Sequence, residues 1–248
     1  MKVLVIILLS ISTVFSLTFC KKKPITTVET GTVTLELSHL WEDSVFQLNE
    51  NFVNTPTTDT FNFQTFNYYI SNIQLKNEAG NWITIPNTYY LINLSDISTT
   101  SMTLKNVPKG EYSAISILFG IDSLHNISGA QEGVLSPING MFWSWNSGYI
   151  MLKMEGITPN NSTGSFSFHL AGFEGTNSIV HRKEISFNTE KAVVSNTSPK
   201  VNLRINTDQI WKESPSISSI YFVQSVGKDS KEMSKAFTNG WEFSHIDN

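Results

Sequence analysis

Two histidines and two tryptophans are the side chains of this sequence best suited to metal chemistry. His125 and His169 flank Trp143 and Trp145, which are two residues apart in the chain. Imidazole nitrogen is a ligand that suits copper and zinc, and a tryptophan beside a redox metal is an oxidisable group. The spacing therefore predicts a metal site that combines imidazole ligands with an oxidisable aromatic neighbour.

The remaining three histidines are weaker candidates. His39 shares the parity of the alternating apolar residues at 33–37, so it points inward as either a core imidazole or a ligand. His181 precedes the cationic pair at 182–183, which disfavours a bound cation, and His245 lies close to the C-terminus. A single histidine is usually structural, so the location of His125 and His169 is what raises them above the others.

The N-terminus has the features of a targeting signal. Residues 1–19 contain a basic start and an apolar run, which suits a signal peptide better than a membrane span. Cys20, the only cysteine, ends a sequence that resembles a bacterial lipobox, although Phe19 stands where a small residue is usual. We expect a bacterial lipoprotein anchored to a membrane through Cys20, in the periplasm or at the cell surface of the outer membrane.

The composition predicts a folded domain. Of the 248 residues, 40% are hydrophobic and 15% are charged, and the net charge is −4 without long charged runs. Nucleic-acid binding needs a concentrated basic surface, so the sequence excludes that class. We expect a signal peptide at 1–19, a tether at 20–31 and one domain at 32–248.

Short alternating or β-branched runs predict an all-β fold. They are separated by turn signals about every 8 to 12 residues, which is typical of an antiparallel β-sandwich of immunoglobulin-like, Greek-key type. Only residues 208–211 and 229–237 indicate helices. The expected strands include 32–39, 66–75, 82–85, 89–94, 112–121, 149–154, 165–170, 184–187, 200–205 and 219–223.

Residues 122–148 differ from the rest of the chain, because they combine four glycines and a proline with little periodicity. We expect a long, glycine-rich, ordered loop, and long loops on β-scaffolds often carry function. His125 lies in this loop. His169 lies on the face of its strand opposite the apolar residues Phe166 and Phe168.

Enzymatic motifs are scarce. The chain has no Gly-x-Ser-x-Gly, no His-Glu-x-x-His and no glycine-rich phosphate loop. Asp122, Ser123 and His125 resemble a triad in composition only, since neighbours in one segment point in different directions. Asp122, Asn126 and Asp96 could bind calcium, but the dense pattern of a calcium loop is missing. We expect a binding protein and not an enzyme.

Four segments, taken in order, resemble the MbnP-like family. Those segments are FNYYISNIQL at 66–75, GIDSLHNISGAQEG at 120–133, MFWSWNSGYIMLKMEG at 141–156 and FSFHLAG at 166–172. The family consists of periplasmic or surface copper-binding proteins associated with methanobactin operons. The resemblance covers most of residues 32–248.

The resemblance implies a β-sandwich that holds one copper through histidines. It implies His125 and His169 as ligands and His39 as the third. In relatives a tryptophan is oxidised to kynurenine by a dihaem peroxidase-like partner, which here points first to Trp143 and then to Trp145. A histidine site should lose copper as the pH falls through about 6, because protonated imidazole cannot ligate a metal.

Two other functions remain open at this point. The first is a surface adhesion or carbohydrate-recognition module in which Trp143, Trp145 and Tyr149 form an exposed aromatic platform. The second is an enzyme subunit that uses copper for oxidation chemistry. The exposure of the rings and their distance from His125 and His169 distinguish the platform from a copper site.

Overall fold

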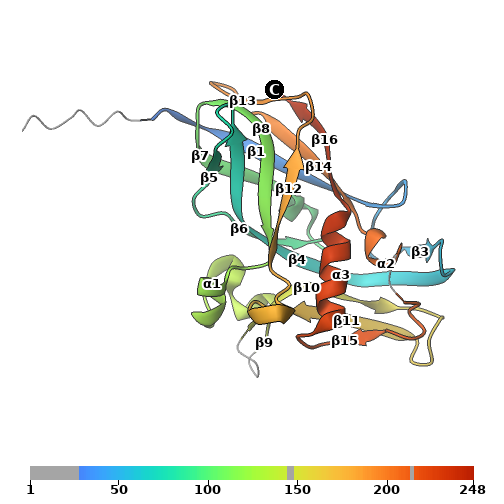
Figure 1. Cartoon of the computed structure of the whole chain (residues 1–248). Helices are drawn as coiled ribbons and strands as arrows, with labels where there is room; N and C mark the ends of the chain where they lie inside the picture. The colour runs from blue at the N-terminus through green and yellow to red at the C-terminus, as the bar shows by residue number, and fades with distance from the viewer. Residues whose placement is uncertain (1–27, 144–147, 213–214) are drawn as a thin grey trace, which may run out of the picture.

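The computed structural model describes residues 28–143, 148–212 and 215–248, and strands dominate it (Figure 1). The prediction of a mostly β protein is therefore confirmed. The elements, with η for a 3-10 helix, are β1 (Thr30–Trp41), β2 (Ser44–Val45), β3 (Asn51–Asn54), β4 (Asp59–Asn77), β5 (Trp82–Thr84), β6 (Tyr89–Asn93), η1 (Ile97–Thr100), β7 (Ser101–Pro108), β8 (Gly110–Phe119), α1 (Ser123–Ile127), η2 (Gly133–Leu135), η3 (Pro137–Asn139), β9 (Phe142–Trp143), β10 (Gly148–Ile157), β11 (Ser165–Ala171), η4 (Gly175–Asn177), β12 (His181–Ser186), β13 (Ala192–Val194), β14 (Lys200–Asn206), α2 (Gln209–Lys212), β15 (Phe222–Val223), α3 (Lys228–Asn239) and β16 (Trp241–Asp247).

The described strands form two sheets. The smaller has five strands in the order β16-β14-β1-β2, with β7 also pairing with β1. The larger has eleven strands, and its main path is β12-β8-β4-β10-β11-β15. The long strand β4 is the centre of the larger sheet, since it pairs with β3, β5, β6, β8 and β10.

Both sheets are mixed, so the prediction of a wholly antiparallel, immunoglobulin-like sandwich is not confirmed. β1 pairs in parallel with β14, from Thr34 opposite Lys200 to Leu40 opposite Asn206. β11 pairs in parallel with β15. Alternation of apolar residues is the same in parallel and antiparallel strands, so local patterning cannot report the direction of a partner so far away in the chain.

An aromatic core fills the space between the sheets and α3. On β1 the predicted alternation is confirmed, because Val33, Leu35 and Leu37 are buried. Aromatic rings in the same core pack against one another in tilted and edge-to-face pairs, each of which adds about 0.5–1.5 kcal/mol beyond the burial of its area. The rings include Trp41, Phe46, Phe61, Phe63, Phe66, Tyr68, Phe166, Phe168, Trp211, Phe237 and Trp241.

Both predicted helices are confirmed. α2 covers the first of them, and α3 lies over β11 and buries Met233 and Phe237 (Figure 1). Gly240 follows α3, where an added Cβ would lie 2.4 Å from the carbonyl oxygen of Asn206. Only glycine allows the chain to turn back into β16 at this distance. No helix in the described ranges is both long and apolar enough to cross a membrane.

The predicted glycine-rich loop at 122–148 is partly regular structure. It contains α1, η2, η3 and β9, and residues 144–147 lie outside the described part. The buried Asn126 donates from Nδ2 to the carbonyl oxygens of Ile121 (2.6 Å) and Asp122 (3.1 Å). Its Oδ1 accepts from the backbone N–H of Tyr149 at 3.3 Å. Asn126 therefore holds α1 against the start of β10.

Candidate functional site

His125 lies on α1 in contact with the N-cap residue of that helix, Asp122, and with Tyr89 of β6. Its Nδ1 is 3.0 Å and 3.1 Å from the two carboxylate oxygens of Asp122 and 2.9 Å from the hydroxyl oxygen of Tyr89. Tyr89 also donates to Asp122, and its ring centroid is 4.3 Å from that of His125. Within the described residues nothing hydrogen-bonds to Nε2 of His125.

Asp122 determines which nitrogen of His125 carries the proton. Partial burial raises the pKa of Asp122, but hydrogen bonds from Tyr89, His125 and Asn72 outweigh burial and hold that pKa well below its usual range. An ionised carboxylate can only accept hydrogen bonds. Nδ1 of His125 therefore donates to Asp122, and the lone pair of Nε2 is left for another partner.

The backbone places this group through a helix cap and a β-bulge. Asp122 is the N-cap of α1 and accepts from the backbone N–H of His125 at 3.1 Å. On β4 the register shifts between Ser71 and Gln74, and Asn72 adopts a φ of 47° in that bulge. Such a bulge redirects side chains, and Nδ2 of Asn72 reaches Oδ2 of Asp122 at 2.8 Å.

His169 lies on β11 among polar side chains, on the face opposite its buried neighbours, as predicted. Its Nε2 is 2.7 Å from Oε1 of Glu155 and 3.4 Å from Oγ of Ser167. Gln224 donates to the same Ser167 oxygen at 2.8 Å. Lys153, which is opposite His169 in the sheet, has its ammonium 3.7 Å from Oε2 of Glu155.

The charges around His169 have opposing effects on a bound cation. Burial lowers the pKa of His169 and the Glu155 carboxylate partly opposes this, so the ring is neutral near pH 7. Since the carboxylate accepts from Nε2, the lone pair lies on Nδ1, which has no hydrogen bond to any described residue. The ammonium of Lys153 repels a cation, whereas Glu155 attracts one.

His39 occupies a different environment, inside the core. Only 7% of its surface is exposed, and burial lowers the pKa of His39 to about 3. Its Nε2 is 2.9 Å from the hydroxyl oxygen of Tyr68, which is fully buried. That hydroxyl proton needs an acceptor, and Nε2 is the one that the described residues provide. His39 therefore carries its proton on Nδ1 and offers no free lone pair.

The structure does not bring the three predicted ligands together. In residues 28–143, 148–212 and 215–248, no group of three or more His, Cys, Asp and Glu side chains could hold a metal ion. His125 with Asp122 and His169 with Glu155 are thus two separate pairs. The three-histidine site implied by the resemblance is not assembled in this part of the chain.

The remaining predicted residues divide between buried and undescribed positions. Trp143, on β9 opposite Gly148, is 6% exposed, and Tyr149 is 1% exposed. An aromatic platform needs exposed rings, so that alternative is wrong for Trp143 and Tyr149. Trp145 and Cys20 lie outside the described residues.

The two other histidines are structural or peripheral. His181 uses both ring nitrogens, at 2.7 Å from the carbonyl oxygen of Ile179 and at 2.7 Å from the hydroxyl of Thr238. Burial, partly offset by the Ile179 contact, lowers the pKa of His181. His245 is exposed on β16, with Nε2 3.8 Å from Asp247. Neither has the arrangement of a ligand.

The partners of the candidate ligands were missed from the sequence. Tyr89 is 36 residues before His125 in the chain, and Glu155 is 14 residues before His169. Neither pair has a characteristic spacing. The only local signals are the position of Asp122 before a helix, which is typical of an N-cap, and the asparagine at position 72, a residue type that tolerates positive φ.

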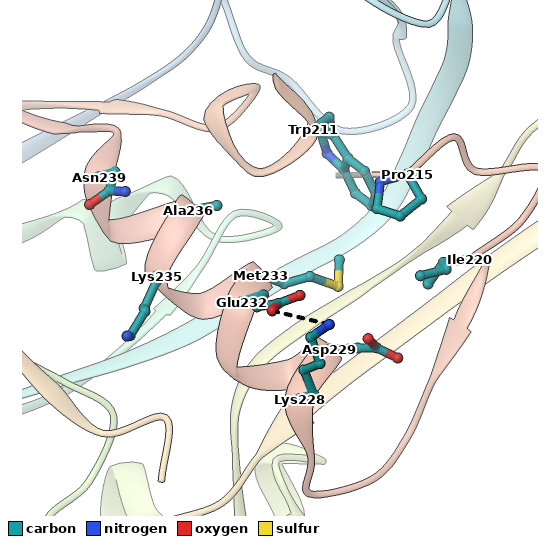
Figure 2. A pocket seen from close by; sticks show the side chains of 10 residues that line it. All are labelled: Trp211, Pro215, Ile220, Lys228, Asp229, Glu232, Met233, Lys235, Ala236 and Asn239. Atoms are coloured by element: carbon teal, nitrogen blue, oxygen red, sulfur yellow. Dashed lines mark ion pairs between the residues drawn. The ribbon is translucent and has the colours of Figure 1, made fainter. Parts of the chain in front are cut away.

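The described residues also line cavities outside these clusters. One cavity, of about 570 Å³, lies beside α3. Figure 2 shows its lining, with Trp211, Met233 and charged side chains. Lys228 and Glu232 form an ion pair there at 3.6 Å. Another, of about 590 Å³, is lined by His39 and the segments 45–49 and 94–100. Neither cavity contains His125 or His169.

Known proteins resemble this chain in sequence and in fold. The sequence profile of the MbnP family matches residues 30–230. No curated protein sequence matches the chain significantly. Among solved structures, MbnP from Methylosinus trichosporium has a TM-score of 0.50 and 16% identity, over 82% of this chain and 84% of that one. At this identity the structural match is a likeness of fold.

Proposed function

Because this chain belongs to the MbnP family, we propose that it binds copper outside the cytoplasm, for capture or handover, and that it is not an enzyme. The observation that carries the proposal is shared by His125 and His169. Each has one ring nitrogen bonded to a carboxylate, while the other nitrogen has no hydrogen bond to a described residue. Histidines that ligate metals are usually oriented by such a carboxylate.

Copper contacts Nε2 of His125 and Nδ1 of His169 as two separate centres. The support for two centres is that no larger ligand group exists among the described residues. Each centre then has one imidazole, and water or residues outside the described part complete the coordination. A site with few protein ligands exchanges its metal readily, which suits capture and handover.

His39 is left out of the ligand set. Its lone pair is used by Tyr68 and its ring is buried. Ligating copper through Nδ1 would require the proton to move to Nε2, which would leave the buried Tyr68 hydroxyl without an acceptor. An unmade hydrogen bond of this kind costs about 1–3 kcal/mol.

The proposal includes a modification, an anchor and a partner. A dihaem peroxidase-like protein oxidises Trp143 or Trp145 to kynurenine, whose amine and ketone are metal donors that an unmodified indole lacks. Cys20 carries the lipid that fixes the protein to a bacterial membrane, in the periplasm or at the cell surface. These points follow from the resemblance in the sequence and are independent of the two histidine centres.

Copper stoichiometry tests the ligand assignment. We expect two coppers in the wild type, one in His125→Ala, one in His169→Ala and none in the double variant. The matched control is His245→Ala, which removes an exposed histidine and should keep both coppers. Copper binding that persists in the double variant would show that the ligands lie elsewhere.

Mass spectrometry tests the modification separately. In protein from its native host, we expect the mass change of a tryptophan-to-kynurenine conversion in a peptide that contains Trp143 or Trp145. Protein made without the haem partner should lack that change. Unmodified peptides from the native host would remove the modification from the proposal and leave the copper centres untouched.

A further inference from the structure

The cavity beside His39 has the lining of a site for an uncharged ligand. Its volume is about 590 Å³, within the range of about 300–1,000 Å³ that is usual for small-molecule sites. No Asp, Glu, Lys or Arg is among the described residues that line it. Its walls come from β1, β2, β4 and the loops at 45–49 and 94–100.

His39 supplies a hydrogen-bond donor to this cavity. The proton lies on Nδ1, because Nε2 accepts from Tyr68, and no described residue hydrogen-bonds to Nδ1. The side chain is more than nine-tenths buried and lines the cavity. Nδ1 is not one of the buried polar atoms that lack a hydrogen-bond partner in the described residues, so it is accessible from the cavity. An oxygen of a ligand in the cavity can therefore accept a hydrogen bond from it.

The rim of the cavity carries amides, and its wall carries apolar groups. Gln47, Asn49 and Gln64 are exposed there, and their side chains have no hydrogen-bond partner among the described residues. Leu48 and Leu94 are half-buried between them. Amides both donate and accept hydrogen bonds, so the rim matches a ligand that carries several hydroxyl groups around an apolar face.

The cavity beside α3 provides a contrast within the same molecule. Lys228, Asp229, Glu232 and Lys235 line it (Figure 2). Because it contains both lysines and carboxylates, such a site can pair with an anionic or a cationic ligand. The described lining of the His39 cavity has no such charged group, and moving a charged group out of water without a partner is costly. The His39 cavity therefore selects against charged ligands.

From these contacts we propose that the His39 cavity binds a neutral saccharide unit. A sugar oxygen accepts from Nδ1 of His39, and other hydroxyls bond to Gln47 and Gln64. The apolar face of the ring packs against Leu48 and Leu94. The site does not depend on the copper centres, and it differs from the aromatic platform, whose rings are buried.

The test is an NMR titration of the full domain, labelled with 15N, against maltose and cellobiose, with the uronic acid of each as the charged counterpart. We expect a neutral disaccharide to shift the Nδ1 signal of His39 and the backbone signals of 45–49 and 94–97. The signals of His125 should not move. The uronic acids should bind at least tenfold more weakly, because their carboxylate finds no partner.

Substitutions at the rim locate the site without disturbing the core. Gln64→Ala and Gln47→Ala should each weaken binding about tenfold, as expected for one lost hydrogen bond. Gln74→Ala is the control, since Gln74 is a half-buried glutamine on the same strand that donates to Thr84 and lies outside the cavity. The proposal is overturned if neither neutral disaccharide shifts these signals at millimolar concentration. It is also overturned if both rim variants bind like the wild type.

Discussion

The histidines of this protein occupy two contrasting environments. His125 and His169 are partly buried, each bonded to a carboxylate that leaves the other nitrogen with a free lone pair. His39 lies in the core, bonded to a tyrosine hydroxyl that takes its lone pair. The imidazole ring thus has a lone pair available for a metal in one region, and in the other region it uses that lone pair to accept a hydrogen bond inside the core.

The difference follows from what each partner can do. A carboxylate accepts a hydrogen bond from one ring nitrogen and leaves the lone pair of the second nitrogen free, whereas a buried hydroxyl donates a hydrogen bond to a ring nitrogen and occupies its lone pair. Burial adds a second difference, because it lowers the pKa of His39 and so opposes a positive charge on that ring. The partner of a histidine, and not its burial alone, decides whether a metal can bind.

Removing the core histidine should have the largest effect on stability. In His39→Ala we expect the free energy of unfolding to fall by about 3 kcal/mol, because the variant leaves a cavity and an unpaired Tyr68 hydroxyl. Copper binding should be unchanged. Urea unfolding and copper titration measure the two effects, and a loss of copper in this variant would return His39 to the ligand set.

Changing the carboxylate beside His125 should affect copper next most strongly. Asp122→Asn keeps the helix cap, since asparagine caps as well as aspartate, but it removes the charge that fixes the tautomer of His125. We expect copper affinity at this centre to fall by about 10–100-fold. Isothermal titration of the His169→Ala background isolates the centre, and an unchanged affinity there would contradict the role given to Asp122.

The pH dependence of stability tests the buried environment. In the unfolded chain His39 titrates near pH 6.5, and in the folded protein near 3. Well above pH 6.5, His39 is neutral in both the folded and the unfolded chain. Its titration therefore does not reduce the free energy of unfolding there. As the pH falls from 6.5 toward 3, only the unfolded chain gains the proton, and the free energy of unfolding decreases.

At pH 5 this linkage amounts to about 2 kcal/mol. The variant His39→Gln, whose amide oxygen can accept from Tyr68, should lose this part of the acid sensitivity. Urea unfolding at pH 7.5, 6 and 5 compares the two proteins. Parallel pH profiles would mean that folding does not lower the pKa of His39.

The smallest expected effect is at the carboxylate beside His169. Glu155→Gln should weaken copper binding at this centre by about tenfold, partly because the ammonium of Lys153 loses its partner. Titration in the His125→Ala background measures this effect. If Glu155→Gln bound copper more tightly, the role of Glu155 as the group that orients His169 would be wrong.

Much of the local structure could be predicted from residue patterns. The alternation along β1 placed His39 inward, and the phenylalanines of β11 placed His169 on the opposite face. The helices α2 and α3 were also found from the sequence, whereas α1 was not. The binding contacts could not be found in this way. Tyr89 reaches Asp122 from 33 residues away, and no periodicity links them.

The sequence alone determined that the chain is mostly strands, which side chains of the alternating segments face inward and which family the motifs resemble, because these follow from the order of neighbouring residues. It missed β3, β7, β13 and β16. The tertiary structure decided the parallel pairing of β1 with β14, the separation of His125 from His169 and the partner of each histidine. Those features depend on contacts between segments that are far apart in the sequence. Such contacts become favourable only when the whole chain is packed.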